Sequence, residues 1–166
     1  MDKLSLWKKA TSLRKHLGED SQSPIDIFSL VHTIDYLTLV FYPMGDRLSG
    51  MCIKHPNSNV IAVNSEMSVG RQRFSMAHEL FHLFYDTDMA TTVCAKKIGV
   101  GQPIEKEADQ FASYFLMPPD ALTDAILRIK KEKNDQLTVE SIVKLEQYFG
   151  VSRQAILIRL IECVHD

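Results

Sequence analysis

The sequence contains few cysteines, glycines and prolines. Three cysteines, Cys52, Cys94 and Cys163, are spread over 166 residues, and no two of them form a C-x-x-C pair. An odd number of widely spaced cysteines is typical of reduced thiols, with a single disulfide as the minor alternative. Seven glycines and six prolines are too few for a collagen-like or linker-rich chain. These absences argue against a secreted disulfide scaffold and against a low-complexity protein.

Long apolar runs and an excess of one charge are also missing. No run of about 18 apolar residues is present, so we expect no membrane-spanning segment. Lys8, Lys9, Arg14 and Lys15 interrupt the apolar positions near the N-terminus, so we expect no signal peptide. Together with reduced cysteines, this pattern predicts a cytoplasmic protein. The net charge of -2 argues against direct binding to nucleic acid.

The residues that are present predict a globular α+β fold. Hydrophobic residues make up 45% of the chain and charged residues 24%, which is enough to build a core. We expect a small sheet early in the chain and helices after it, and the short turns between the strands favour an antiparallel arrangement. The predicted strands are 37–42, 51–54 and 59–64. The predicted helices are 4–17, 24–32, 74–85, 104–117, 120–133, 139–149 and 153–164.

The last two predicted helices have the spacing of a helix-turn-helix. Gly150 ends the first helix and Ser152 caps the second. The second helix is mostly apolar, whereas a helix that reads a DNA groove needs exposed polar side chains. We therefore favour a helical hairpin that packs on the rest of the protein over a DNA-binding element.

The segment His78-Glu79-Leu80-Phe81-His82 is an H-E-x-x-H motif. Positions i and i+4 of a helix lie one turn apart on the same side, so the two imidazoles can reach one zinc ion. Glu79 lies about 100° further around the helix, where it can take a proton from an attacking water. The surrounding helix is apolar on nearly every side and is expected to be buried. The alternative is a hydrogen-bonded pair of core histidines without a metal.

A third ligand can come from two places. Asp88 has the spacing of the H-E-x-x-H-x-x-G-x-x-H/D pattern, but Tyr85 stands where that pattern needs a glycine. A glutamate on a later helix is the other source, and Glu105 and Glu107 are the candidates. We favour Glu105, because Asp109 follows it by one turn and can accept the second ring N–H of a ligand histidine. The alternative for both glutamates is a solvated helix start.

These motifs resemble those of the ImmA/IrrE family of metallopeptidases. The matching segments are 71–82 (RQRFSMAHELFH), 105–112 (EKEADQFA) and 115–118 (FLMP), and the resemblance covers about residues 20–160. In two places the sequence departs from the family. Phe81 stands where the family usually has glycine, which we expect to narrow the mouth of the site, and Asp109 stands where it often has asparagine.

The resemblance implies a zincin-like core, with a small sheet packed on the H-E-x-x-H helix and on a second helix that supplies a glutamate ligand. It implies Zn²⁺ bound by His78, His82 and this glutamate, with Glu79 as the general base. We expect residues 1–117 to form this metallopeptidase core with its N-terminal helices, and residues 118–166 to form a C-terminal helical subdomain packed on it.

Two functions follow from this interpretation. The first is a cytosolic zinc endopeptidase that cleaves a regulatory protein, which the resemblance identifies as a helix-turn-helix repressor of a phage, a mobile element or a stress response. The alternative is a zinc-containing regulatory module that acts on a repressor or on DNA without proteolysis. Only three good protein ligands are present in the sequence, and catalytic zinc keeps an open position, so we favour the enzyme.

Overall fold

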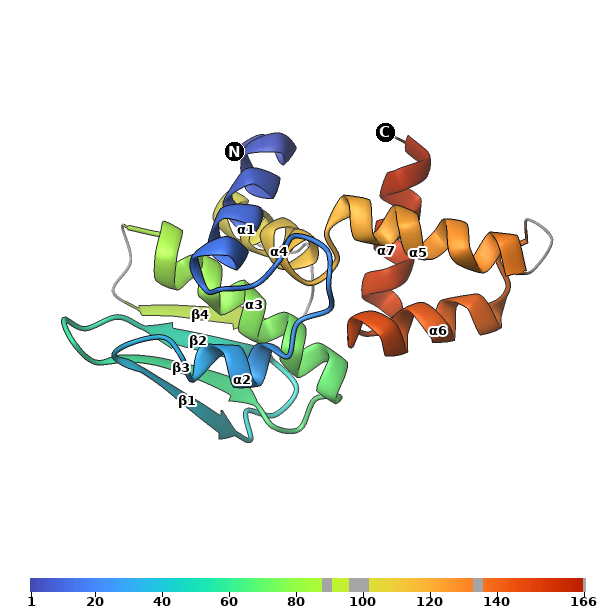
Figure 1. Cartoon of the computed structure of the whole chain (residues 1–166). Coiled ribbons are helices and arrows are strands. Elements are labelled where there is room, and N and C mark those ends of the chain that lie inside the picture. The colour runs from blue at the N-terminus through green and yellow to red at the C-terminus, as the bar shows by residue number, and fades with distance from the viewer. Residues whose placement is uncertain (88–90, 96–101, 133–135, 166) are drawn as a thin grey trace.

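The structure, a computed structural model, describes residues 1–87, 91–95, 102–132 and 136–165 (Figure 1). The helices are α1 (Lys3–His16), α2 (Ile27–Val31), α3 (Val69–Tyr85), α4 (Pro103–Leu116), α5 (Pro119–Glu132), α6 (Val139–Phe149) and α7 (Arg153–His165). The strands are β1 (Leu37–Tyr42), β2 (Leu48–Ile53), β3 (Asn59–Asn64) and β4 (Thr91–Ala95). The predicted α+β class is confirmed. None of the described helices is long and apolar enough to cross a membrane.

The sheet is mixed, and the antiparallel arrangement predicted for it is wrong at one pairing. The strand order is β1-β3-β2-β4. Strand β2 runs antiparallel to β3 and β4, but β1 pairs in parallel with β3, with Leu37 opposite Asn59 and Tyr42 opposite Asn64. The chain therefore passes from β1 to β2 across a gap that β3 later fills. Strand β4 lies in the segment 86–103, which the sequence predicts to be a loop, with a short element of its own as the alternative.

The side chain of Asn64 supports the loop that makes this crossing. Asn64 ends β3 and is completely buried. Its Oδ1 accepts a hydrogen bond from the Met44 backbone N–H at 3.1 Å. Its Nδ2 donates to the carbonyls of Gly45 at 2.9 Å and Leu48 at 2.8 Å. The amide thus satisfies the backbone of the β1–β2 loop as that loop passes the end of β3.

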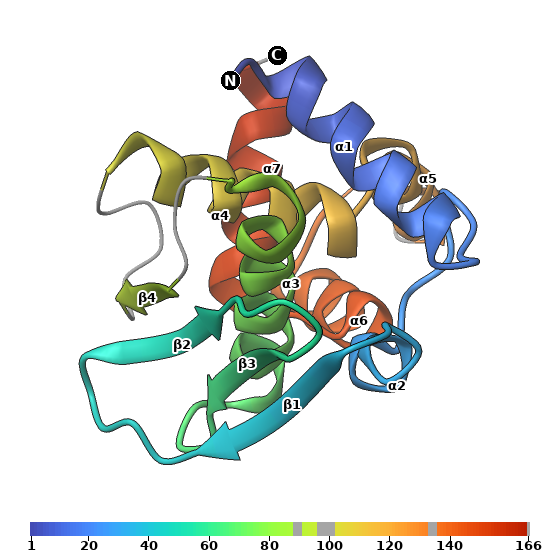
Figure 2. The same ribbon diagram turned by 90° about the vertical axis from the view of Figure 1, so that its left-hand side faces the viewer.

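Helix α3 occupies the centre of the molecule. It contacts β2 and β3 on one side and α4 on the other, and Figure 2 shows it between the sheet and α1. Phe81 of α3 is completely buried and packs against Phe111 of α4, with ring centroids 5.4 Å apart. Its edge also meets the ring of His82. Phe81 therefore packs in the core beneath the motif. The expectation that it narrows the mouth of the site, drawn from its replacement of a glycine, is wrong.

Buried Arg14 joins α1 to the end of α4. Its side chain is 1% exposed. Nη1 donates to the carbonyl of Phe115 at 2.7 Å, and Nε donates to the carbonyl of Asp20 at 2.7 Å. Nη2 donates to the carbonyl of Ser23. All three sides of the guanidinium are therefore bonded to backbone carbonyls, which explains how a charged group is accommodated in the core.

Local signals set the ends of the C-terminal helices. Thr138 and Ser141 form a reciprocal capping box at the start of α6, and Gly150 ends this helix in the left-handed conformation, with φ of 65°. Helices α6 and α7 contact each other, as expected for a hairpin. The guanidinium of Arg159 on α7 lies 4.9 Å from the ring centre of Tyr114 on α4. The division of the chain at residue 117 stays a prediction.

Candidate metal centre

The H-E-x-x-H motif lies in the buried middle of α3. His78 is 6% exposed, and Glu79 and His82 are completely buried. The apolar residues of this helix face the sheet and α4, and this packing carries the three polar side chains inward. Helix α4 packs beside α3 and brings Glu105, in its first turn, over the motif.

Two imidazoles and one carboxylate converge at this point. His78 Nε2 lies 3.2 Å from His82 Nε2 and 3.3 Å from Glu105 Oε2. His82 Nε2 lies 3.4 Å from Glu105 Oε1. One ligand atom from each residue lies within 4.8 Å of the others, so the three side chains form a group able to bind a metal ion. The side chain of Glu105 is 24% exposed, which leaves this side of the group open to solvent.

The other nitrogen of each imidazole is hydrogen-bonded to a carboxylate. His78 Nδ1 donates to Asp109 Oδ1 at 2.8 Å, and His82 Nδ1 donates to Asp86 Oδ2 at 3.0 Å. These bonds orient both rings so that their Nε2 atoms face each other. Two nitrogen lone pairs and a carboxylate directed at one point repel one another unless a proton or a metal ion lies between them. The donor set therefore fits a metal ion.

The charge balance of the group supports this interpretation. Burial lowers the pKa of His78, but hydrogen bonds to Asp109 and Glu105 raise it more, and the resulting pKa is about 10. Burial and the neighbouring His78 lower the pKa of His82. At neutral pH the metal-free group therefore holds a proton on His78. A metal ion that binds at Nε2 takes the place of this proton.

Glu79 lies against the strand β2 at Gly50, where a larger residue would force its neighbours to shift. A Cβ atom on Gly50 would lie 2.8 Å from Glu79 Oε1 and 2.6 Å from Ser75 Oγ. Burial and the nearby charge of Glu79 raise the pKa of the Cys52 thiol, also on β2, to about 12. The strand thus approaches the carboxylate of Glu79 closely and shields it from solvent.

Asp86 and Lys54 belong to the site but were not predicted from the sequence. Asp86 is 7% exposed and follows His82 by four residues, the same helical spacing that singled out Asp109. Lys54 Nζ donates to the carbonyls of His82, at 3.0 Å, and of Asp86. It holds the last turn of α3 in place. Lys54 follows β2, and no local pattern indicates that this lysine reaches α3.

Of the other candidate ligands, Glu107 is engaged outside the ligand group. Glu107 forms an ion pair with the N-terminal ammonium of Met1, which lies at the start of the chain beside α1. Asp88 lies outside the described residues. Of the two glutamates considered, the structure thus brings Glu105 to the histidines.

Tyr85, which stands where the alternative pattern needs a glycine, contacts α1. It donates its hydroxyl hydrogen to the carbonyl of Lys9 at 3.1 Å, and the Lys9 ammonium lies 4.2 Å from the centre of the Tyr85 ring.

Comparison with known proteins gives one family match. Residues 38–161 match a peptidase family described as the IrrE N-terminal-like domain. Two radiation response metalloproteases named IrrE are similar in sequence. The relative from Deinococcus deserti is 36% identical and the relative from Deinococcus radiodurans is 32% identical, each over 107 residues. Each alignment includes 62% of this chain.

The chain spans about a third of the length of these relatives, with 37% of the first and 32% of the second covered. A solved structure of a Mycobacterium tuberculosis transcriptional regulator has a similar fold, with a TM-score of 0.58 and 18% sequence identity. It matches 94% of this chain, which covers 46% of the regulator.

Proposed function

The chain belongs to the IrrE N-terminal-like family of peptidases, and on this basis we propose that it is a zinc-dependent endopeptidase. This membership confirms the resemblance drawn from the motifs. The observation that carries the proposal is the convergence of His78 Nε2, His82 Nε2 and the Glu105 carboxylate within 4.8 Å. Two histidines and one glutamate are a common ligand set of catalytic zinc, which keeps a further position open. A bound zinc ion supplies Lewis-acid chemistry, because it acidifies water and polarises a carbonyl.

The chain's own residues supply the proton transfers and the orientation. In the proposed mechanism, Glu79 accepts a proton from the water that attacks the peptide carbonyl and later donates it to the leaving amine. Asp109 and Asp86 hold His78 and His82 in position through their Nδ1 hydrogen bonds. The substrate would enter on the side of Glu105, the most exposed member of the ligand group.

We propose a regulatory protein as the substrate, specifically a helix-turn-helix repressor of a phage, a mobile element or a stress response. Two observations support this substrate. The motifs resemble those of the ImmA/IrrE family, and both relatives in Deinococcus are named for a response to radiation. A dedicated regulatory protease is expected to show weak activity toward generic peptides.

The variant Glu79→Gln tests the proposal. It keeps the size of the side chain and the ligand group but removes the general base. We expect zinc-loaded Glu79→Gln to retain its metal and to capture its substrate from an extract of the source cells without cleaving it. The zinc-loaded wild type should then cleave the captured protein, producing one new N-terminus that mass spectrometry identifies.

The same variant separates proteolysis from regulation by contact alone. If the chain were only a binding module, Glu79→Gln would preserve its regulatory effect in cells. Loss of this effect, with the metal content and fold unchanged, would reject the binding module. Cleavage by Glu79→Gln at the wild-type rate would contradict the proposed role of Glu79.

A further inference from the structure

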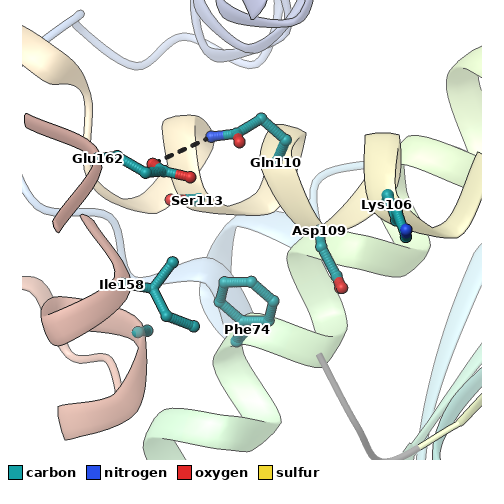
Figure 3. A pocket seen from close by; sticks show the side chains of 8 residues that line it. Phe74, Lys106, Asp109, Gln110, Ser113, Ile158 and Glu162 are labelled. Atoms are coloured by element: carbon teal, nitrogen blue, oxygen red, sulfur yellow. Dashed lines mark hydrogen bonds between the residues drawn. The ribbon is translucent and has the colours of Figure 1, made fainter. Parts of the chain in front are cut away.

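A pocket lies next to the metal centre, between α3, α4 and α7 (Figure 3). Its volume is about 240 Å³, below the range of about 300–1,000 Å³ that is usual for sites of small-molecule ligands. Phe74 of α3 with Ala155 and Ile158 of α7 form its apolar side. A pocket of this size and lining suits one large side chain better than a whole cofactor.

The pocket contains a buried hydroxyl that lacks a hydrogen-bond partner. Ser113 of α4 lines the pocket and is 7% exposed, and its Oγ makes no hydrogen bond in the described part of the chain. A buried hydroxyl without a partner costs about 1–3 kcal/mol. Gln110, one turn earlier on α4, faces Glu162 of α7 across the pocket, with 3.5 Å between Nε2 and Oε2. Ser113 Oγ is itself buried, so a polar group in the pocket can bond to it only after the neighbouring side chains shift.

The charged groups around the pocket are already engaged. Asp109 accepts the hydrogen bond of His78, and Glu162 accepts a hydrogen bond from Arg159 Nη1 at 2.7 Å. Lys106 is exposed, so its ammonium is solvated at the rim. One oxygen of each carboxylate is therefore already bonded. The apolar side formed by Phe74 and Ile158 favours an uncharged occupant.

Asp109 links the pocket to the metal centre. The same side chain lines the pocket and lies 2.8 Å from His78 Nδ1. An extended peptide advances about 3.3 Å per residue, so a peptide whose carbonyl lies at the metal ligands can place a nearby side chain over the pocket.

We propose that this pocket selects the substrate by binding one large, uncharged side chain near the scissile bond. Phe74 and Ile158 contact the apolar part of this side chain, and Ser113 Oγ bonds to its polar tip after the neighbouring side chains shift, as a tyrosine would allow. This inference rests on the proposed peptidase function, since it assigns the pocket to a polypeptide substrate.

Binding of single amino-acid amides tests the pocket without requiring cleavage. The probes are N-acetyl-tyrosinamide, N-acetyl-phenylalaninamide and N-acetyl-lysinamide, added to the zinc-loaded, ¹⁵N-labelled chain and followed by NMR. We expect the tyrosine probe to shift the amide signals of residues 110–113 and 155–158, and to bind more tightly than the lysine probe. Ser113→Ala should weaken binding of the tyrosine probe about 2–10-fold and leave the phenylalanine probe unchanged, because only tyrosine carries the hydroxyl.

A matched pair of variants on α7 tests the location. Ile158 lines the pocket and Leu157 beside it does not, and their exposed fractions are similar, 36% and 41%. We expect Ile158→Trp to fill the pocket and to weaken both aromatic probes at least tenfold, whereas Leu157→Trp should bind them like the wild type. Unchanged binding to Ile158→Trp, no shifts at residues 110–113 and 155–158, or preferential binding of the lysine probe would overturn the proposal.

A peptide library then separates this inference from the proposed function. The wild type should prefer a large uncharged residue at one fixed position beside the cleaved bond, and Ile158→Trp should prefer small residues there. Cleavage without such a preference would overturn the pocket assignment and leave the peptidase intact. If the probes bind but the zinc-loaded wild type cleaves neither the library nor captured protein, the peptidase function fails, and the assignment to a substrate fails with it.

Discussion

His78 Nδ1 donates a hydrogen bond to Asp109 Oδ1 at 2.8 Å, which joins the two helices that carry the ligand group. His82 has a corresponding partner in Asp86, which directly follows the end of α3. Each imidazole is thus oriented by a carboxylate from a different segment of the chain. Since these bonds fix the direction of both Nε2 atoms, the geometry of the centre depends on the packing of α3 against α4 as well as on the spacing of the motif.

The first prediction concerns the two glutamates of α4. Glu105→Ala removes a proposed ligand, whereas Glu107→Ala removes only a partner of the Met1 ammonium. We expect about one zinc per chain in the wild type and in Glu107→Ala, and a clear loss in Glu105→Ala, because zinc in such sites takes three protein ligands. Elemental analysis of the purified proteins measures this directly. The reverse pattern would identify Glu107 as the ligand.

The second prediction concerns Asp86, which accepts the Nδ1 hydrogen bond of His82. Removing a carboxylate that orients a ligand histidine typically weakens metal binding about 10–100-fold. We expect a loss of this size in Asp86→Ala and a smaller loss in Asp86→Asn, whose amide oxygen can still accept the bond. Competition with a zinc chelator gives the affinities. Equal affinities in the wild type and Asp86→Ala would show that His82 is held by packing alone.

The third prediction concerns pH. Burial lowers the pKa of His78, but Asp109 and Glu105 raise it more, to about 10. Below this pKa a metal ion must displace a proton, so zinc affinity should rise with pH, by up to about tenfold per unit between pH 6 and pH 8. Asp109→Asn removes one of the charges that raise the pKa, and its slope should be shallower. A pH-independent affinity would mean that His78 carries no proton in the metal-free protein.

The fourth prediction concerns stability. Arg14 donates to three backbone carbonyls in a buried position, and Arg14→Ala leaves these carbonyls without that partner. We expect a loss of about 2–4 kcal/mol in the free energy of unfolding. Lys15→Ala, at the exposed neighbouring position, should change it by less than about 0.5 kcal/mol. Urea unfolding with a chelator present measures both without a contribution from metal binding. Similar losses in the two variants would contradict this role of Arg14.

The local features of this protein were predictable from its sequence. The ranges predicted for the first and third strands coincide with β1 and β3, and Gly150 ends α6 as expected. The positions of His78 and His82 on one side of a helix follow from their spacing alone. These features depend on interactions among residues a few positions apart, so a short segment of sequence contains the information. Several boundaries were missed, since α2 begins at Ile27 and not at residue 24, β2 at Leu48 and not at residue 51, and α3 at Val69 and not at residue 74.

Tertiary structure decided which distant residues meet. The structure pairs β1 with β3 in parallel, and the buried amide of Asn64 bonds to the loop that leads from β1 to β2. The sequence favoured an antiparallel arrangement because short turns usually join neighbouring strands. The docking of α4 on α3 brings Glu105 to the histidines and turns Glu107 toward Met1. Sequence spacing places both glutamates at the start of one helix. It favours Glu105 as the ligand but does not exclude Glu107. Packing between helices separated in the chain decides which carboxylate reaches the site, because that choice depends on long-range contacts that no local pattern encodes.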